Sequence, residues 1–287
     1  MSIKSILVPL SGGAMDAACL AAADPIAKQH RAHVTALFAA ADSSAIPMAM
    51  MTDGTGLALS GNLVETLQEQ VDNRRARAEA AFAQWQASCA LPSAKRTARS
   101  GPSANLLVET GEESQLVRTH GVVADLIILP APAAGEVERE LALESALFDA
   151  GRPVLTLPGP DLPTPAADAP IVIAWNGSAE AAHALTGALP FLASASAVTV
   201  LHAGHADRRT LLNPVVTYLG RHGVKAAARG IPDHGDAGKA ILAEALRLEA
   251  GLLVMGAYTH SRVREFVFGG VTRHVLDQAR LRVLAAH

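Results

Sequence analysis

The stretch Ile6-Leu7-Val8-Pro9-Leu10-Ser11-Gly12-Gly13 decides the fold, because it has a counterpart 165 positions later, Ile171-Val172-Ile173-Ala174-Trp175-Asn176-Gly177-Ser178. Each is a short apolar run followed by a small polar residue and glycine. Such a run, bounded by turn residues, is typical of a strand buried on both faces of a parallel sheet. Alanine-rich amphipathic segments follow both runs and predict helices over 16–30 and 179–192.

Three further apolar segments repeat in the same order. Residues 34–37 match 198–201 at an offset of 164, residues 124–130 match 250–256 at 126, and residues 152–155 match 281–284 at 129. Strands that alternate with helices indicate right-handed crossovers and a parallel sheet. The sequence therefore predicts an α/β protein with two tandem Rossmann-like domains, each a five-stranded parallel sheet with helices on both faces.

The offsets also place the domain boundaries and the differences between the copies. We predict a first domain over 1–158, a proline-rich linker over 159–169 and a second domain over 170–287. The first copy is longer between its second and fourth strands, in an insertion of about 41–90. This region contains a loop rich in Met, Gly and Ser over 41–61 and a predicted helix over 63–90.

Composition limits the classes of partner. Half of the residues are hydrophobic and 18% are charged, so the chain can bury two cores. The net charge is −3 and no basic block is present, which argues against a nucleic-acid partner. No apolar run approaches the ~18–20 residues that a membrane span needs. We expect a cytoplasmic protein with no nucleic-acid or membrane partner.

The second copy carries the strongest site signal. In parallel sheets ligands bind beyond the carboxyl ends of the strands. Here the strand ending at Gly256 is followed by Gly269 and Gly270, where an amphipathic helix through about residue 279 is predicted to start. Glycine allows close backbone approach, and a helix N-terminus directs free N–H groups at an anion. Together with the Thr272 hydroxyl, this pattern predicts a phosphate cradle.

This segment resembles the universal stress proteins, whose pattern after the fourth strand is Gly-x2-Gly-x9-Gly-Ser/Thr. Met255-Gly256-Ala257-Tyr258 and Arg264-Glu265-Phe266-Val267-Phe268-Gly269-Gly270-Val271-Thr272 carry the resemblance. Gly256 and Gly269 match the first and third glycines, whereas Thr259 replaces the second glycine and Gly270 the Ser/Thr. Asn176 stands where the family has an aspartate after its first strand.

The resemblance implies an adenine-nucleotide pocket in the second domain, with ATP or AMP as the ligand. No metal is expected beyond the Mg²⁺ that accompanies a nucleotide. The resemblance assigns the pocket to Ala174, Asn176, Ala203, Met255, Gly256, Thr259, Gly269, Gly270, Val271 and Thr272. It also implies that the chain is a fused dimer, an intrachain pseudo-dimer whose two sheets face through their last strands. A further homodimer is compatible with this arrangement.

The first copy departs further from the pattern. After its fourth strand come Pro130 and Pro132, and then Glu136, Glu138 and Glu140. Prolines lack N–H donors and glutamates repel phosphate, so we predict that this site is closed to nucleotide.

Three functions remain open at this point. The first is a non-enzymatic stress-response factor with a nucleotide pocket in its second domain. The second is an interaction or regulatory module that binds no nucleotide. The third is a weak ATPase or adenylyl-transferring enzyme of the same superfold. We favour the first, because the sequence contains neither a Gly-x-Ser-x-Gly nucleophile elbow nor a pair of carboxylates at the ends of two strands. Either pattern would have predicted catalytic residues.

Overall fold

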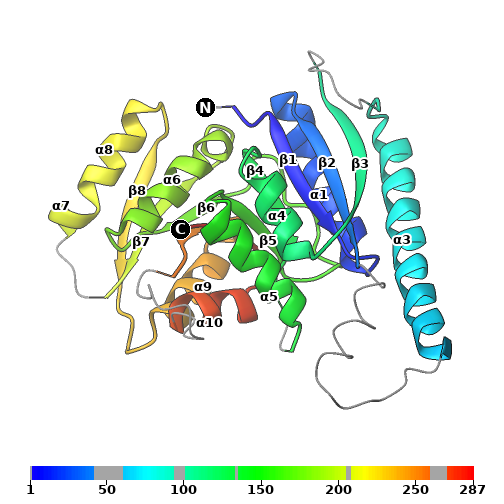
Figure 1. Cartoon of the computed structure of the whole chain (residues 1–287). Helices are drawn as coiled ribbons and strands as arrows, with labels where there is room; N and C mark the ends of the chain where they lie inside the picture. The colour runs from blue at the N-terminus through cyan, green and yellow to red at the C-terminus, as the bar shows by residue number, and fades with distance from the viewer. Residues whose placement is uncertain (1, 42–60, 94–100, 133–134, 205–207, 259–269) are drawn as a thin grey trace.

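The structure is a computed structural model that describes residues 2–41, 61–93, 101–132, 135–204, 208–258 and 270–287. It is a three-layer α/β molecule in which one mixed sheet lies between two layers of helices (Figure 1). The predicted fold class is confirmed, with one addition: the two five-stranded sheets join edge to edge into a single ten-stranded sheet.

The first half of the chain, up to residue 157, supplies five strands and the helices between them. Its strands are β1 Ser5–Leu10, β2 His33–Ala40, β3 Ser103–Thr110, β4 Leu126–Pro130 and β5 Val154–Leu157. Its helices are α1 Met15–His30, α3 Gly61–Cys89, α4 Glu113–Gly121, α5 Val137–Glu144 and the single-turn π-helix η1 Ser145–Asp149.

The second half, from residue 171, repeats this order. Its strands are β6 Ile171–Ala174, β7 Val198–Ala203, β8 Ala226–Ile231, β9 Leu252–Gly256 and β10 Arg282–Ala286. Its helices are α6 Ala179–Leu192, α7 Arg208–Leu211, α8 Asn213–Arg221, α9 Ala237–Arg247 and α10 Gly270–Gln278. The 29-residue helix α3 takes the place in the chain order that the short helices α7 and α8 take in the second half.

The sheet order is β3-β2-β1-β4-β5-β10-β9-β6-β7-β8. Neighbouring strands within each half are parallel, and among the described strands the direction changes at the centre, where β5 pairs antiparallel with β10. There Leu155 lies opposite Leu284 and Thr156 opposite Val283. The carboxyl ends of the two sets of strands therefore point in opposite directions.

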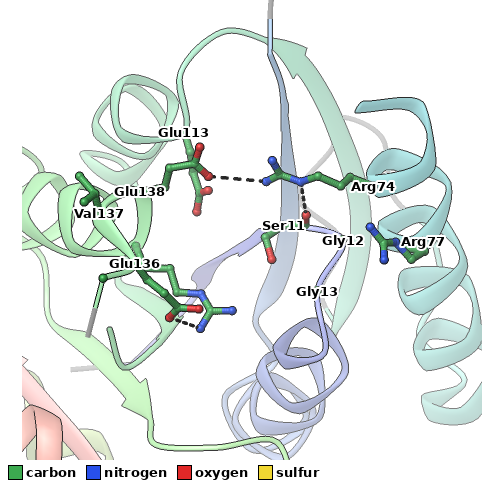
Figure 2. Close-up of a pocket in the computed structure, with 11 residues that line it drawn as sticks. Ser11, Gly12, Gly13, Arg74, Arg77, Glu113, Glu136, Val137 and Glu138 are labelled. Atoms are coloured by element: carbon green, nitrogen blue, oxygen red, sulfur yellow. Dashed lines mark hydrogen bonds and ion pairs between the residues drawn. The ribbon is translucent and has the colours of Figure 1, made fainter. Parts of the chain in front are cut away.

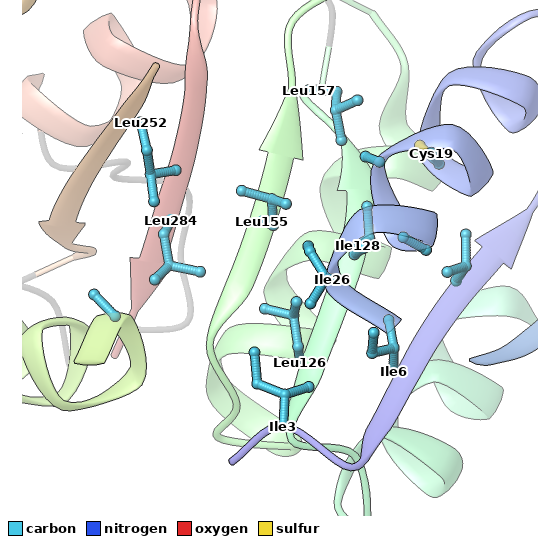
Figure 3. Close-up of a cluster of buried hydrophobic side chains, with 14 of the residues drawn as sticks. Ile3, Ile6, Cys19, Ile26, Leu126, Ile128, Leu155, Leu157, Leu252 and Leu284 are labelled. Carbon is cyan, nitrogen blue, oxygen red and sulfur yellow. The ribbon is translucent and has the colours of Figure 1, made fainter. Parts of the chain in front are cut away.

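Each face of the sheet has its own hydrophobic core, and each core includes both halves of the chain. One core packs α1, α3, α6 and α8 against the sheet, and the other packs α4, α5, α9 and α10. Figure 3 shows the first core crossing the central strand pair, with Leu155 on β5 and Leu284 on β10. Because continuous apolar runs supply both faces, the strands are buried on both sides.

Local signals in the sequence explain where helices begin and end. Asp236 begins α9, and its side chain accepts the N–H of Lys239 at 2.9 Å. Ser178 begins α6 in the same way, accepting the N–H of Ala181 at 3.1 Å. These short polar side chains satisfy N–H groups that the first helical turn leaves unpaired. The predicted helices over 16–30, 63–90 and 179–192 are confirmed to within two residues.

Candidate functional site

A cavity of about 200 Å³ lies in the second half, at the carboxyl ends of β6, β7 and β9 and the start of α10. Strands β6 and β9 are neighbours, and the helices that follow them, α6 and α10, pack on opposite faces of the sheet, which makes this the switch point of the half-sheet. The structure brings eight of the ten predicted residues to this cavity. They are Ala174, Asn176, Ala203, Met255, Gly256, Gly270, Val271 and Thr272. The other two, Thr259 and Gly269, lie outside the described residues.

Gly256, the last residue of β9, is required for packing. A β-carbon on Gly256 would lie 2.5 Å from the backbone nitrogen of Ala181, in the first turn of α6. A side chain at this position would therefore push α6 away from the strand end. The close approach holds the start of α6 beside the cavity that Gly256 also lines.

Asn176 lines the cavity, and the oxygen of its side-chain amide already has a hydrogen-bond partner. Its Oδ1 accepts the backbone N–H of Ser178 at 3.0 Å in a tight local turn. A backbone N–H can only donate, so the end of the amide that faces Ser178 must be the oxygen. The Nδ2 group is then the end that can donate to a ligand. The side chain is exposed and lines the cavity, so it is available to a ligand. An aspartate here would offer only acceptors.

Thr272 has a structural contact in addition to its place in the cavity wall. Its Oγ1 accepts the N–H of Tyr258 at 3.2 Å, and its side chain is buried. Tyr258 adopts φ +62°, in the left-handed region that costs a residue with a β-carbon about 1–2 kcal/mol. The Thr272 hydroxyl therefore fixes a strained turn directly after β9, and its own proton can still be donated.

Four lining residues were missed by the sequence analysis: Trp175, His202, Ala237 and Ile241. His202 precedes Ala203 at the end of β7, and its Nδ1 lies 2.9 Å from the carbonyl oxygen of Trp175. Because that carbonyl can only accept, Nδ1 carries the proton and the neutral ring has its bare nitrogen at Nε2. The strand-end rule could have found His202, but only the tertiary structure places α9 beside it.

The lining fits the base and ribose of an adenine nucleotide better than its metal. Ala174, Met255 and Val271 provide apolar surface, while Asn176 and the start of α10 provide hydrogen-bond donors. No carboxylate is among the described lining residues, so Mg²⁺ would be held by phosphate oxygens and water. Among the described residues there is also no group of three or more His, Cys, Asp or Glu side chains placed to hold a metal.

A larger cavity, of about 540 Å³, lies at the corresponding strand ends of the first half. Figure 2 shows it beside Ser11, Gly12 and Gly13, which follow β1. Sequence analysis did not predict this cavity, because the helix α3 that forms one wall is remote in sequence from the strand ends. The prediction that this site is closed to nucleotide remains a prediction.

The site and the sheet order together define the chain as a doubly wound α/β protein with a cavity at its switch point. The first of three similar solved structures is a universal stress protein from Archaeoglobus fulgidus, with a TM-score of 0.71, 15% identity and coverage of 98% of this chain and 97% of that one. Its fold is shared along the full length of the chain.

Two Pseudomonas aeruginosa structures have the same fold at lower similarity. A protein of unknown function gives a TM-score of 0.56, with 16% identity and coverage of 99% and 92% of the two chains. A protein with a provisional universal stress assignment gives 0.55, with 17% identity and coverage of 99% and 93%. No family model and no curated protein matches the sequence. The chain therefore has the universal stress protein fold.

In the part of the chain that the structure describes, each helix is too short or too polar to cross a bilayer.

Proposed function

We propose that the chain is a non-enzymatic, cytoplasmic stress-response protein of the universal stress type, and that its second half binds an adenine nucleotide, ATP or AMP. One observation carries the proposal: the eight described residues that the family pattern assigns to the pocket line one cavity at the switch point of the half-sheet. Ligands of doubly wound sheets bind at this place.

Each wall of the cavity has a role in this proposal. The base lies against the apolar ends of β6 and β9, at Ala174 and Met255. The Nδ2 amide of Asn176 donates to a ribose oxygen, because its Oδ1 is already bonded to Ser178. The phosphates lie towards Gly270, where α10 begins and where a β-carbon would meet no described residue within 4 Å.

The decisive experiment is calorimetric titration of the full chain with ATP and with AMP. Asn176→Ala removes the ribose donor and is expected to weaken binding about tenfold, since a lost hydrogen bond costs about 1.5 kcal/mol. The matched control is Ser11→Ala, because Ser11 is the first-half counterpart of Asn176 and lines the other cavity. Absence of heat with both nucleotides at millimolar concentration would reject the proposal in favour of an interaction module.

The enzymatic alternative rests on His202, an imidazole in the cavity wall. A neutral Nε2 could accept a proton from a water that attacks a phosphate. We propose that it instead serves binding, because no carboxylate of the described lining would orient a metal beside it. Steady phosphate release from ATP that His202→Gln abolishes would establish the enzyme.

The proposal extends to the organisation of the chain. We propose that residues 1–158 and 170–287 are two domains, joined by the linker 159–169, that form an intrachain pseudo-dimer. The antiparallel pairing of β5 with β10 supports this, because two copies related by a two-fold axis meet through the same strand.

A further inference from the structure

The cavity of the first half has a size suited to a small molecule. Its volume of about 540 Å³ falls within the roughly 300–1,000 Å³ of ligand pockets. It lies where β1 ends, between α3 on one side and α4 and α5 on the other (Figure 2). Its chemistry differs from that of the second half.

The backbone N–H groups beside this cavity are already occupied. Asp16, which is 4% exposed, accepts the N–H of Ser11 at 3.0 Å through Oδ1 and that of Gly12 at 2.8 Å through Oδ2. In the phosphate-binding version of such a loop, these donors face the ligand. Here an internal carboxylate fills the cradle and adds negative charge, which disfavours a phosphate at this position.

Two arginines of α3 bring further hydrogen-bond donors to the cavity wall. Arg74 and Arg77 lie one turn apart, and both line the cavity. Arg74 Nε donates to the Ser11 carbonyl at 2.9 Å. Gly12, at φ +73°, packs so closely on α3 that a β-carbon would overlap the Arg74 carbonyl oxygen. The helix is therefore docked firmly on the β1–α1 loop, and Arg77 is positioned beside it.

The cavity contains three arginines and three glutamates. Four of them form two ion pairs: Arg74 with Glu138 at 3.8 Å, and Arg139 with Glu136 at 2.6 Å. The remaining two are Arg77 on α3 and Glu113 at the start of α4. Neither has a hydrogen bond or ion pair of its own to a described residue. One cation and one carboxyl group are thus left on opposite walls (Figure 2).

We propose that this cavity binds a small zwitterionic carboxylate, a free amino acid, with its carboxylate on Arg77 and its ammonium group towards Glu113. The guanidinium fork of arginine matches a carboxylate, and a ligand with one charge of each sign preserves the charge balance of the walls. A simple anion would face Glu113 and Glu138, and a simple cation would face the arginines. The proposal is independent of the nucleotide site in the second half.

The pH dependence separates this ligand from a simple anion. Burial, and secondarily Glu138, raise the pKa of Glu113 to about 7; the other charged groups that act on it are Arg74, Asp16 and Arg139. An ammonium group binds best to the ionised carboxylate, so affinity for an amino acid should rise with pH through about 7 and then level off. A simple anion prefers the protonated carboxyl, and its affinity should fall over the same interval.

The test is calorimetric titration of the full chain with each standard amino acid, and with succinate, inorganic phosphate and putrescine as single-charge-type probes. We expect at least one amino acid to bind, with higher affinity at pH 8 than at pH 6. Arg77→Ala should weaken this binding at least tenfold, and Glu113→Gln should remove its pH dependence. Arg77 is exposed, so its replacement leaves the fold intact.

Arg75→Ala is the matched control, because Arg75 lies on the same helix but pairs with Glu79 at 2.7 Å and does not line the cavity. Asn176→Ala should leave amino-acid binding unchanged, which separates this site from the nucleotide site. The proposal is overturned if no amino acid binds, if only succinate, phosphate or putrescine binds, or if Arg75→Ala weakens binding as much as Arg77→Ala.

Discussion

Gly256 at the end of β9 and Ala181 in the first turn of α6 approach so closely that a β-carbon on the glycine would lie 2.5 Å from the alanine nitrogen. The family pattern assigns this glycine to phosphate binding, but in this chain its first requirement is the packing of α6. The distinction matters for mutagenesis, since loss of ligand binding in a Gly256 variant would not by itself establish a contact with the ligand.

Gly256→Ala should destabilise the fold by about 1–3 kcal/mol, because α6 must shift to admit the methyl group. Urea unfolding followed by circular dichroism measures the change. Gly270→Ala is the control, since its β-carbon would meet nothing within 4 Å in the part of the chain that the structure describes. Equal stability of the two variants would contradict the packing role.

Gly270→Ser should strengthen ATP binding. A β-carbon at this position meets no described residue within 4 Å, and the serine places a hydroxyl at the first position of α10, where the family pattern has Ser or Thr. One added hydrogen bond contributes about 1 kcal/mol, or roughly fivefold in Kd. Calorimetry on this variant and on Gly270→Ala separates the hydroxyl from the added carbon. If both variants bind ATP equally, the hydroxyl makes no contact.

Glu113 should make the folded state less stable as pH rises. Burial raises its pKa from 4.5 to about 7, so between these values the folded state retains a proton that the unfolded state has lost. The free energy of unfolding therefore falls across this interval and changes no further above it. Glu113→Gln should be more stable than the parent at pH 8, and this advantage should shrink at pH 5.

Urea midpoints at the two pH values measure the effect of Glu113. Glu69→Gln replaces an exposed glutamate on α3 and serves as the control; its stability relative to the parent should not change between the two pH values. If the midpoint of Glu113→Gln equals that of the parent at both pH values, the Glu113 carboxyl does not titrate in this interval.

Glu244 should stabilise the fold above the acid range. Its carboxylate bonds to Arg247 at 2.7 and 2.9 Å and contacts Arg229 at 2.5 Å, which joins α9 to β8. The Arg247 hydrogen bonds, with the charge of Arg229, lower the pKa of Glu244. This contribution is present above the unfolded-state pKa of about 4.5 and is lost as pH falls through the lower folded-state value.

Glu244→Gln should cost about 1 kcal/mol at pH 7, with a difference that narrows below pH 4.5. Glu79→Gln tests a simple helical pair, because Glu79 pairs with Arg75 four residues earlier on α3, and it should cost less. A pH-independent loss in Glu244→Gln would point to packing instead of charge.

Much of the fold could be predicted because the apolar runs at Ile6–Leu10 and Ile171–Ala174 have no polar face to turn to solvent. Such runs fit the interior of a parallel sheet that is covered by helices on both faces. Eight residues that line the second-half cavity could be named from the family resemblance, and they lie together because the carboxyl ends of neighbouring parallel strands meet at one edge of the sheet. The packing role of Gly256 could not, because it depends on how α6 docks.

The cavity of the first half escaped prediction for a different reason. Glu136 and Glu138 suggest repulsion when they are considered by themselves. In the folded chain both pair with arginines, Arg139 close in sequence and Arg74 about 60 positions away. A local pattern contains no information about that second partner.

The antiparallel seam between β5 and β10 has a consequence for how the polypeptide tolerates being cut. Both hydrophobic cores include residues on each side of the β5–β10 pair, and Leu155 lies opposite Leu284. These contacts between the two halves do not involve residues 159–169. A protease cut within residues 159–169 should therefore leave two fragments that co-elute as a heterodimer. The two halves could equally be encoded by separate genes and assemble after translation.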